Sequence, residues 1–379
     1  MKTSQSVFTS NNGWQPGLTM LSAMNPALLL VFGSRSLLQE FDFTSDLRKV
    51  FPSAHIMGCS TAGQIAGTFI YDDSLVLTAI EFEHTSIKGR HKLINSASDS
   101  FETGRSLATD LMTDDLVHLL VLSDGLKVNG SELVRGLTSV LPPEVSITGG
   151  LAGDNDAFQD TLTFWDSLPL KDNVAVLGFY GKHLRVGYGS RGGWDPFGPE
   201  RIITRADGNI LYEMDGRSAL QLYKTYLGEH AQGLPATGLL FPLSIRNQDN
   251  GPALVRTILG VNEEEESLTF AGDLPLGSLA RLMKANIDRL IDGAISAAEA
   301  SRSTYLHSSP VLAILISCVG RRLVLKQRSE EEVEGVSEVM AASTMLAGFY
   351  SYGEICPSVS DGKPDLHNQT MTITTFYEV

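Results

Sequence analysis

The stretch LAGFYSYGEICP, residues 346–357, combines an apolar strand pattern with a cluster of polar side chains near the end of the chain. In an extended strand alternate residues share one face, which would place Tyr350, Tyr352, Glu354 and Cys356 side by side. Two phenols and a carboxylate on such a face either satisfy one another in the core or project into a ligand pocket. The sequence leaves both interpretations open.

Length and composition indicate a globular protein. The chain has 379 residues, enough for two domains, with 42% hydrophobic and 19% charged residues. Its net charge of −15 disfavours binding to nucleic acid and to anionic membranes. The longest apolar run, at residues 310–320, is too short to span a bilayer, and the start shows no secretory pattern. We therefore expect a cytoplasmic protein without membrane insertion.

Short motifs argue against several kinds of chemistry. The three cysteines form no CxxC pair and the histidines form no HxH or HExxH pattern, so we expect no metal site. The segment GCSTAGQI at 58–65 has phosphate-loop spacing but lacks the required lysine. GYGSRG at 187–192 matches a dinucleotide pattern, yet no helix can follow it. GxSxG is absent, so we expect no catalytic residue and no enzyme.

The pattern of apolar residues predicts an α/β fold with mixed, largely antiparallel sheets and flanking helices. A hairpin is expected at Asp207-Gly208, and a capping box at Ser329 and Glu332 should begin a late helix. Buried strands are expected at 27–34, 54–61, 116–125 and 310–322, and helices at 98–113, 131–141, 217–228 and 279–301.

A repeated order of sequence features supports duplication of one α/β unit. Residues 116–164 and 311–376 both give a strand, a turn, a helix, a glycine-rich segment and a Thr-x-Thr strand. In each copy an acid follows the glycines, Asp154 in the first and Glu354 in the second. We expect two related domains packed about a pseudo-twofold axis.

Six motifs in this order resemble the FIST proteins: GCSTAGQI, GGLAGD, DGRSAL, SCVGR, GFYSYGEI and HNQT. The resemblance covers nearly the whole chain and implies a FIST N-terminal domain at 1–215 and a C-terminal domain at 216–379. The family is regarded as sensory and ligand-binding. Some stand-alone bacterial members are similar to this chain in size and bind haem to sense nitric oxide, whereas amino acids have been proposed as ligands elsewhere. With no kinase segment of its own, this chain would act on a separate histidine kinase or cyclic-di-GMP enzyme.

The ligand site implied by these motifs is a mostly apolar cleft with a few polar groups. Arg321 or Arg322 would pair with Glu354 or receive an anionic ligand, and a structural ion pair is the alternative. His367 would lie nearby or hydrogen-bond its own loop. A second class is a thiol-dependent hydrolase or transferase using Cys318, and a third is a plain scaffold. The candidate ligand-binding residues are Asp154, Cys318, Arg321, Tyr350, Tyr352, Glu354, His367 and Asn368.

Overall fold

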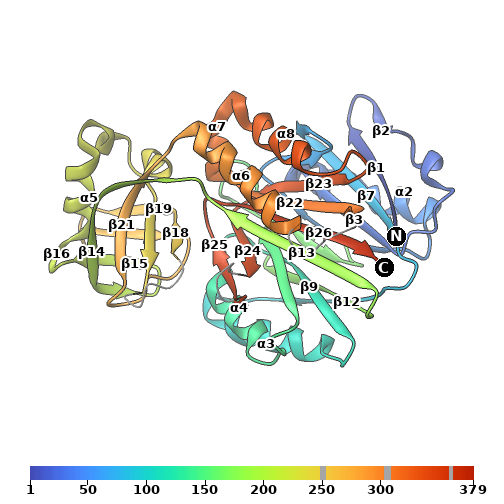
Figure 1. The fold of residues 1–379 in the computed structure, drawn as a ribbon, viewed down its shortest axis with the longest axis horizontal. Coiled ribbons are helices and arrows are strands. Elements are labelled where there is room, and N and C mark those ends of the chain that lie inside the picture. Colours follow the sequence, from blue (N-terminus) through green and yellow to red (C-terminus); the bar gives the residue numbers. More distant parts are fainter. Residues whose placement is uncertain (248–252, 303–308, 358–361) are drawn as a thin grey trace.

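The chain forms a large α/β body and a smaller β-rich domain (Figure 1). The computed structural model describes residues 1–247, 253–302, 309–357 and 362–379. The small domain is formed by residues 195–284 and is inserted between two parts of the body. The chain passes between the two at residues 192–194 and again at 285–286, and these two segments are called the crossings below. Both ends of the chain lie in the body, where the Met1 amino group pairs with Glu378 at 3.0 Å.

The body contains three six-stranded sheets. The first has the order β11 (Thr163–Trp165), β4 (His55–Ser60), β3 (Leu28–Gly33), β7 (Ser74–Glu81), β1 (Lys2–Thr9) and β2 (Gly13–Gln15). The second has the order β25 (Pro364–His367), β24 (Gly353–Pro357), β10 (Ser146–Leu151), β9 (Leu116–Ser123), β12 (Asn173–Tyr180) and β8 (Ser86–Leu93). The third has the order β13 (Leu184–Arg191), β26 (Met371–Glu378), β22 (Leu312–Cys318), β23 (Met345–Ser351), β5 (Gln64–Ala66) and β6 (Phe69–Tyr71).

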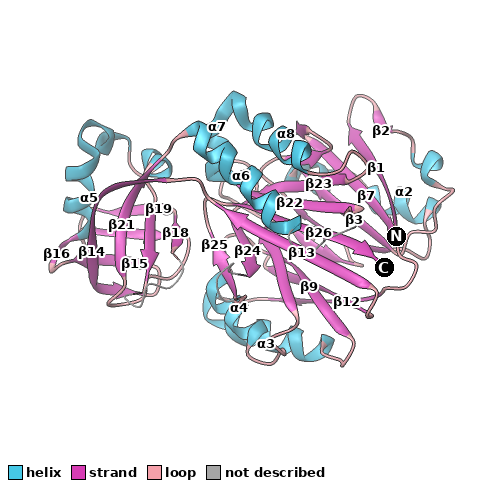
Figure 2. Cartoon of the chain, viewed as in Figure 1, coloured by secondary structure: helices cyan, strands magenta, loops and turns pink. Residues whose placement is uncertain are grey.

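Helices cover the outer faces of these sheets (Figure 2). Helices α1 (Arg35–Glu40) and α2 (Phe43–Val50) belong to the first sheet, α3 (Ser100–Leu111) and α4 (Gly130–Thr138) to the second, and α6 (Ile287–Arg302), α7 (Val319–Leu325) and α8 (Ser329–Val339) to the third. The expected mixed α/β class is confirmed. In the described part of the chain, no helix has the length and apolarity needed to cross a membrane.

The same unit forms the centre of every sheet. A parallel pair, β3 with β4, β9 with β10 or β22 with β23, is joined through helix and flanked by antiparallel strands. The strand–helix–strand part of the repeat expected at 116–164 and 311–376 is therefore confirmed, and the structure adds a third copy at 28–60. The two Thr-x-Thr strands are not equivalent, because β11 pairs with β4 of another unit whereas β26 pairs with β22 of its own. The units also interlock, because β5 joins the sheet of β23, β24 joins that of β10, and β11 joins that of β4.

Alternating residues divide each central strand between two environments. In β3, Leu28 and Leu30 enter a central core shared by the three sheets, whereas Leu29 and Val31 pack against α1 and α2. The central strands of the other two sheets alternate in the same way between this core and their own helices. Burial on both faces explains why these strands are continuously apolar in sequence.

The small domain is a sheet of eight strands around its own core. The hairpin at Asp207-Gly208 is confirmed, but the helix expected from 279 begins only at Ile287. Residues 279–284 form a strand instead, since Ala280 and Leu282 alternate into the core while the backbone pairs on both sides. The elements are β14 (Asp195–Asp207), β15 (Ile210–Met214), β16 (Arg217–Ser218), α5 (Ala219–Leu227), β17 (Leu243–Arg246), β18 (Leu254–Arg256), β19 (Ile258–Asn262), β20 (Ser267–Phe270) and β21 (Leu279–Lys284). The boundary expected at 215/216 lies in the turn between β15 and β16, inside this domain, and stays a prediction.

Candidate functional site

A cavity of about 980 Å³ lies where the small domain meets the body. It opens at the ends of β22 and β23, which is where ligands collect in sheets with parallel strands. Loop and helix residues of the body form one wall, and strands and a 3-10 helix of the small domain form the other. The residues that matter below are Leu126, Phe158, Cys318, Gly320 and Tyr352 from the body, and Thr257 and Leu259 from the small domain.

Tyr352 and Asp154 meet at this cavity, although they are almost 200 residues apart in sequence. The Tyr352 hydroxyl donates to the Asp154 carboxylate and accepts from the backbone N–H groups of Asp154 and Phe158, at 3.2 and 3.3 Å. The Phe158 ring stacks on the Tyr352 ring with centroids 4.5 Å apart. Burial and the neighbouring carboxylate raise the pKa of the Tyr352 phenol. The phenol is therefore a neutral, fixed wall group rather than a free ligand for an ion.

One continuous strand would place Glu354 on the same face as Tyr350 and Tyr352. Of these three residues only Tyr352 lines the cavity. The chain bends at Tyr352, between β23 and β24, so the alternation is interrupted. The buried Glu354 carboxylate accepts from Ser351 Oγ at 2.7 Å and from Thr370 Oγ1 at 2.9 Å. Burial raises the pKa of Glu354 to about 8.

The expected ion pair between Glu354 and Arg321 or Arg322 is wrong. Arg322 pairs with Asp72 at 2.8 Å, and Arg321 pairs with Glu332 at 2.7 Å. Helix α8, which contains Glu332, follows α7 after one short 3-10 turn, so this acid is within reach of the guanidinium. The capping box expected from Glu332 is wrong for the same reason, since its carboxylate is used inside the body.

The buried pair of Arg321 and Glu332 holds the two crossings to the small domain. Arg321 donates to the carbonyl of Gly192, in the first crossing, at 2.5 Å, and to that of Leu290, just after the second crossing, at 2.7 Å. The Tyr350 hydroxyl donates to Glu332 at 2.8 Å. Tyr350 and Arg321 were predicted to bind ligand, but neither lines the cavity, and the structure places them at the junction of the domains instead.

The HNQT segment contributes buried polar groups close to the cavity. His367 Nε2 lies 3.0 Å from the carbonyl oxygen of Cys356, and burial lowers its pKa. Asn368 is fully buried, yet both polar atoms of its carboxamide lack a hydrogen-bond partner among the described residues. Gln369 shares both properties and has a φ of 61°, an unusual backbone for a residue with a side chain. We did not predict Gln369, although the HNQT motif contains it.

A thiol-dependent enzyme using Cys318 would need a neighbouring base such as His367, and the structure does not pair these two residues. The thiol lines the cavity, and the backbone N–H groups of Gln369 and Gly320 face its sulfur. His367 is instead hydrogen-bonded to the Cys356 carbonyl. Burial, with a smaller effect of Glu354, raises the pKa of the Cys318 thiol, so the nucleophilic thiolate is disfavoured.

The side chains around the cavity do not fit haem. Haem iron requires an axial His, Cys, Tyr or Met, and no histidine or methionine of the described residues lines the cavity. Cys318 and Tyr352 supply the thiol and the phenol in the cavity wall, and their raised pKa values keep both groups in the neutral form. Elsewhere in the described chain, no three His, Cys, Asp or Glu side chains gather as a metal site would need.

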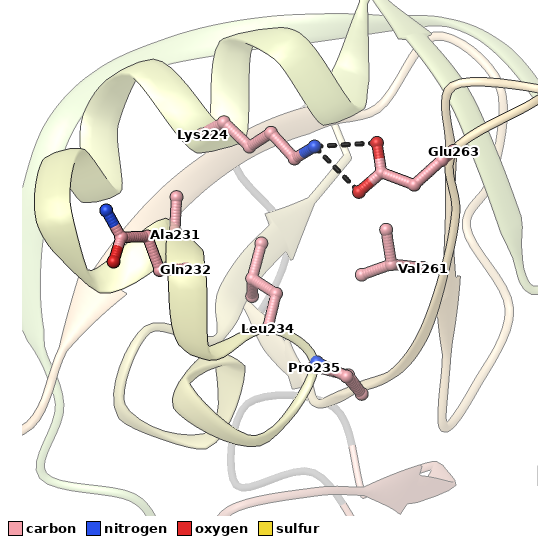
Figure 3. Close-up of a pocket in the computed structure, with 7 residues that line it drawn as sticks. All are labelled: Lys224, Ala231, Gln232, Leu234, Pro235, Val261 and Glu263. Carbon is pink, nitrogen blue, oxygen red and sulfur yellow. Dashed lines mark hydrogen bonds and ion pairs between the residues drawn. The ribbon is translucent and has the colours of Figure 1, made fainter.

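A smaller hollow of about 560 Å³ lies on the small domain (Figure 3). Its charged residues neutralise each other, because Lys224 Nζ donates to both carboxylate oxygens of Glu263, at 2.6 and 2.7 Å. Leu234 and Pro235 line this hollow and also the larger cavity. The larger cavity, with residues from both domains and buried polar groups without partners, is the better candidate site.

Most of this cavity could not be identified from the sequence. Leu126 and Phe158 lie in loops without a motif, and Thr257 and Leu259 belong to the inserted small domain. The predicted residues Cys318 and Tyr352 line the cavity, and Asp154 contacts it through Tyr352. Asn368 lies just behind its wall.

Known proteins with similar sequences span both domains. An uncharacterized protein of Mycobacterium tuberculosis is 25% identical over 372 residues, covering 94% of this chain and 93% of its own length. One of Methanocaldococcus jannaschii is 25% identical over 314 residues, covering 76% of this chain and 59% of its own. Among solved structures, the cyanuric acid hydrolase of A. caulinodans aligns over the full chain with a TM-score of 0.33 and 8% identity.

Two domains of a known family match consecutive parts of the chain. The FIST N domain matches residues 27–217 and the FIST C domain matches residues 219–357. Together they account for most of the body, the whole small domain and the cavity residues described above. The chain therefore belongs to the FIST family of sensory domains.

Proposed function

We propose that this protein is a cytoplasmic small-molecule sensor that holds its ligand between the body and the small domain. The observation that carries the proposal is the position of the cavity. Both of its walls change partners if the small domain rotates. That rotation is restrained by the two crossings, by the polar contacts described below and by an apolar cluster that includes Val255 of the small domain and Val324 of α7. A ligand that contacts both walls would favour the closed arrangement by its differential affinity for the two states.

Few polar contacts hold the two walls together beside the cavity. Arg256 of the small domain donates to the carbonyl of Leu366 at 2.8 Å, and Asn129 of the body donates to Asp273 at 3.1 Å. Both contacts are at the margin of the cavity, so they act as a latch and leave its interior accessible. A latch of two hydrogen bonds is worth about 1–3 kcal/mol, which a ligand can counterbalance.

Apolar side chains at the cavity are available for burial on closure. Leu126, Phe158 and Leu259 are 43%, 42% and 48% exposed and face the same space. Full burial of a Leu or Phe side chain is worth about 1.5–3 kcal/mol, so completing the burial of these three gives about 2–4 kcal/mol. That is the size of a typical allosteric coupling energy.

The cavity and the crossings are joined through one short helix. Gly320 lines the cavity, and the next residue, Arg321, holds the crossings at Gly192 and Leu290. A shift of α7 caused by ligand would therefore change the restraint on the small domain. A separate histidine kinase or cyclic-di-GMP enzyme would read the new arrangement, as the family resemblance suggests.

The experiment is a mass spectrum of the native protein purified from its own host, followed by return of the retained compound to stripped protein. We expect a bound small molecule that raises Tm and lowers the radius of gyration in solution scattering. Phe158→Ala should weaken binding about tenfold, whereas Leu168→Ala, which removes an exposed leucine outside the cavity, should not. Equal binding by both variants would place the ligand elsewhere.

Haem with nitric oxide is a narrower version of this proposal, and the neutral thiol and phenol in the cavity wall argue against it. Its test is a titration of the purified protein with haemin, read at the Soret band. A saturable band at one haem per chain would establish it, and its loss in Cys318→Ala or Tyr352→Phe would identify the axial residue. The lack of a saturable band would remove haem from consideration.

The alternative of a thiol-dependent hydrolase or transferase is favoured by one observation, the position of Cys318 in the cavity wall with two backbone N–H groups facing its sulfur. A screen with activated esters and amides would test it. Hydrolysis that disappears in Cys318→Ala would support catalysis. Activity that persists in this variant would exclude Cys318 as the nucleophile.

A further inference from the structure

We infer that the ligand of this cavity is uncharged and largely apolar, with an amide-type polar end that binds the Asn368 and Gln369 carboxamides. This inference rests on the proposed function and adds the chemical class of the ligand. It is carried by the unpaired polar atoms, by the way charges are already paired around the cavity, and by the residues of its walls.

Two adjacent side chains have unused hydrogen-bonding capacity. Asn368 and Gln369 are completely buried, and all four polar atoms of their carboxamides lack partners. Buried polar groups are otherwise almost always paired, because leaving one unpaired costs the full desolvation penalty. Each carboxamide offers two N–H donors and an acceptor. The group that complements them must therefore both donate and accept, as an amide does.

Neither Asn368 nor Gln369 lines the cavity itself, and both carboxamides lie behind glycines in or next to its wall. A methyl group at Gly320, which lines the cavity, would lie 2.5 Å from Gln369 Nε2, so no side chain separates the two. A methyl group at Gly353, next to Tyr352 in the wall, would lie 3.5 Å from Asn368 Nδ2. The left-handed backbone conformation of Gln369 costs conformational energy, which the surrounding structure must offset. Residues strained in this way concentrate at ligand-binding sites.

The opposite wall supplies another unpaired group. Thr257 of the small domain lines the cavity and is 5% exposed, and its hydroxyl has no partner. A ligand that bridges this hydroxyl and the carboxamides would contact both domains at once. Thr257 is therefore the small-domain contact that would couple ligand binding to closure of the two domains.

The charges near the cavity disfavour an anionic ligand. Arg256 is committed to the carbonyls of Leu366 and Asp273, Arg321 to Glu332, and Arg322 to Asp72. Of the two lysines in the wall, Lys127 pairs with Asp172 and Lys326 is solvent-exposed, so among the described residues no buried cation is left to balance an anion. The buried carboxyl of Glu354 is hydrogen-bonded to Thr370, the residue after Gln369, and supplies no positive charge to attract one.

A cationic ligand is disfavoured as well. The Asp154 carboxylate is already bound by Tyr352, Arg35 and backbone N–H groups, and Asp273 is bound by Asn129. Asp156, the other acid in the wall, is solvent-exposed, and the rest of the wall is mostly aliphatic or aromatic. It includes Leu126, Leu151, Phe158, Leu259, Phe270 and Leu323.

The test uses three probes that share one apolar skeleton and differ in charge: 2-phenylacetamide, phenylacetate and 2-phenylethylamine. Each is titrated into the full chain at pH 7, and binding is measured by calorimetry and by Tm. We expect the amide to bind saturably and to raise Tm by about 2 °C at millimolar concentration. We expect the two charged probes to bind at least about tenfold more weakly.

Variants locate the binding site. Thr257→Val keeps the shape of the side chain and removes the unpaired hydroxyl, and it should weaken the amide about tenfold. Thr9→Val is the matched control, because the Thr9 hydroxyl is also buried and unpaired but lies in β1, away from the cavity. Asn368→Leu should abolish amide binding while the ligand-free protein unfolds at an unchanged or higher temperature, since an unpaired group has been removed.

The outcomes separate this inference from the proposed function. Stronger binding of either charged probe, lost in Thr257→Val, would overturn the ligand class and leave the sensor cavity standing. No saturable binding of the amide also overturns the ligand class. Amide binding that Thr257→Val and Asn368→Leu leave unchanged would overturn both the inferred subsite and the cavity as the sensor site. A lower unfolding temperature for Asn368→Leu would assign Asn368 to structure instead.

Discussion

Glu354 should make the stability of this protein fall as pH rises through neutrality. Its carboxyl group has an ordinary pKa of 4.5, and burial raises the pKa in the folded protein to about 8. Below pH 4.5 both states are protonated, so the full stability is present. Between 4.5 and 8 the folded state retains a proton that the unfolded state releases, so stability is lost as pH rises and levels off above 8.

The variant Glu354→Gln should remove this dependence. A glutamine can donate to Ser351 Oγ and accept from the backbone N–H and hydroxyl of Thr370, which is the pattern available to the protonated acid. At about 1.4 kcal/mol for each pH unit, the interval from 4.5 to 8 corresponds to about 5 kcal/mol. Between pH 5.5 and 7.5 the wild type should lose about 3 kcal/mol relative to the variant.

The assay is urea unfolding of both proteins at half-unit steps from pH 5 to 9, with the difference in unfolding free energy plotted against pH. Other titrating groups cancel in that difference. Glu378→Gln is a control that should give a flat difference between pH 5 and 7: burial acts to raise the pKa of Glu378, but hydrogen bonds from Thr85 and backbone N–H groups lower it to about 2, so its pH dependence should appear below pH 4.5. A flat difference for Glu354→Gln from pH 5 to 9 would refute the reasoning.

Three further predictions concern the core and the junction between the domains. Arg321→Met should destabilise the protein by about 3–5 kcal/mol in urea unfolding, because Glu332 becomes an unpaired buried charge, and the double variant with Glu332→Met should recover part of the loss. A single variant with wild-type stability would show that the pair is unimportant. Gly104→Ala should lower Tm, since the added methyl would lie 2.3 Å from the Leu133 carbonyl oxygen where α3 packs on α4; an unchanged Tm would contradict this close packing. All three cysteines are buried, so a thiol reagent should label none in the native protein at pH 8 and three in denaturant; rapid native labelling would show that a cysteine is accessible.

The sequence predicted those features that depend on neighbours along the chain. The continuously apolar strands, the hairpin at Asp207-Gly208 and the repeated α/β unit were predicted because side-chain periodicity and turn residues act locally. The helix expected from residue 279 was wrong because LARLMK carries a pattern compatible with either state, and pairing with β14 and β17 decided for a strand.

Only the tertiary structure decided which polar groups meet. Sequence reasoning proposed Glu354 as the partner of Arg321, but the helix that follows α7 brings Glu332 to that arginine first. Tyr352 reaches Asp154 because β24 joins the sheet of β10, an exchange between units with no sequence signal. The cavity likewise depends on where the inserted domain docks. Local patterns fixed which residues are buried and in which element, whereas pairing and docking, which act between distant segments, fixed what each buried group contacts.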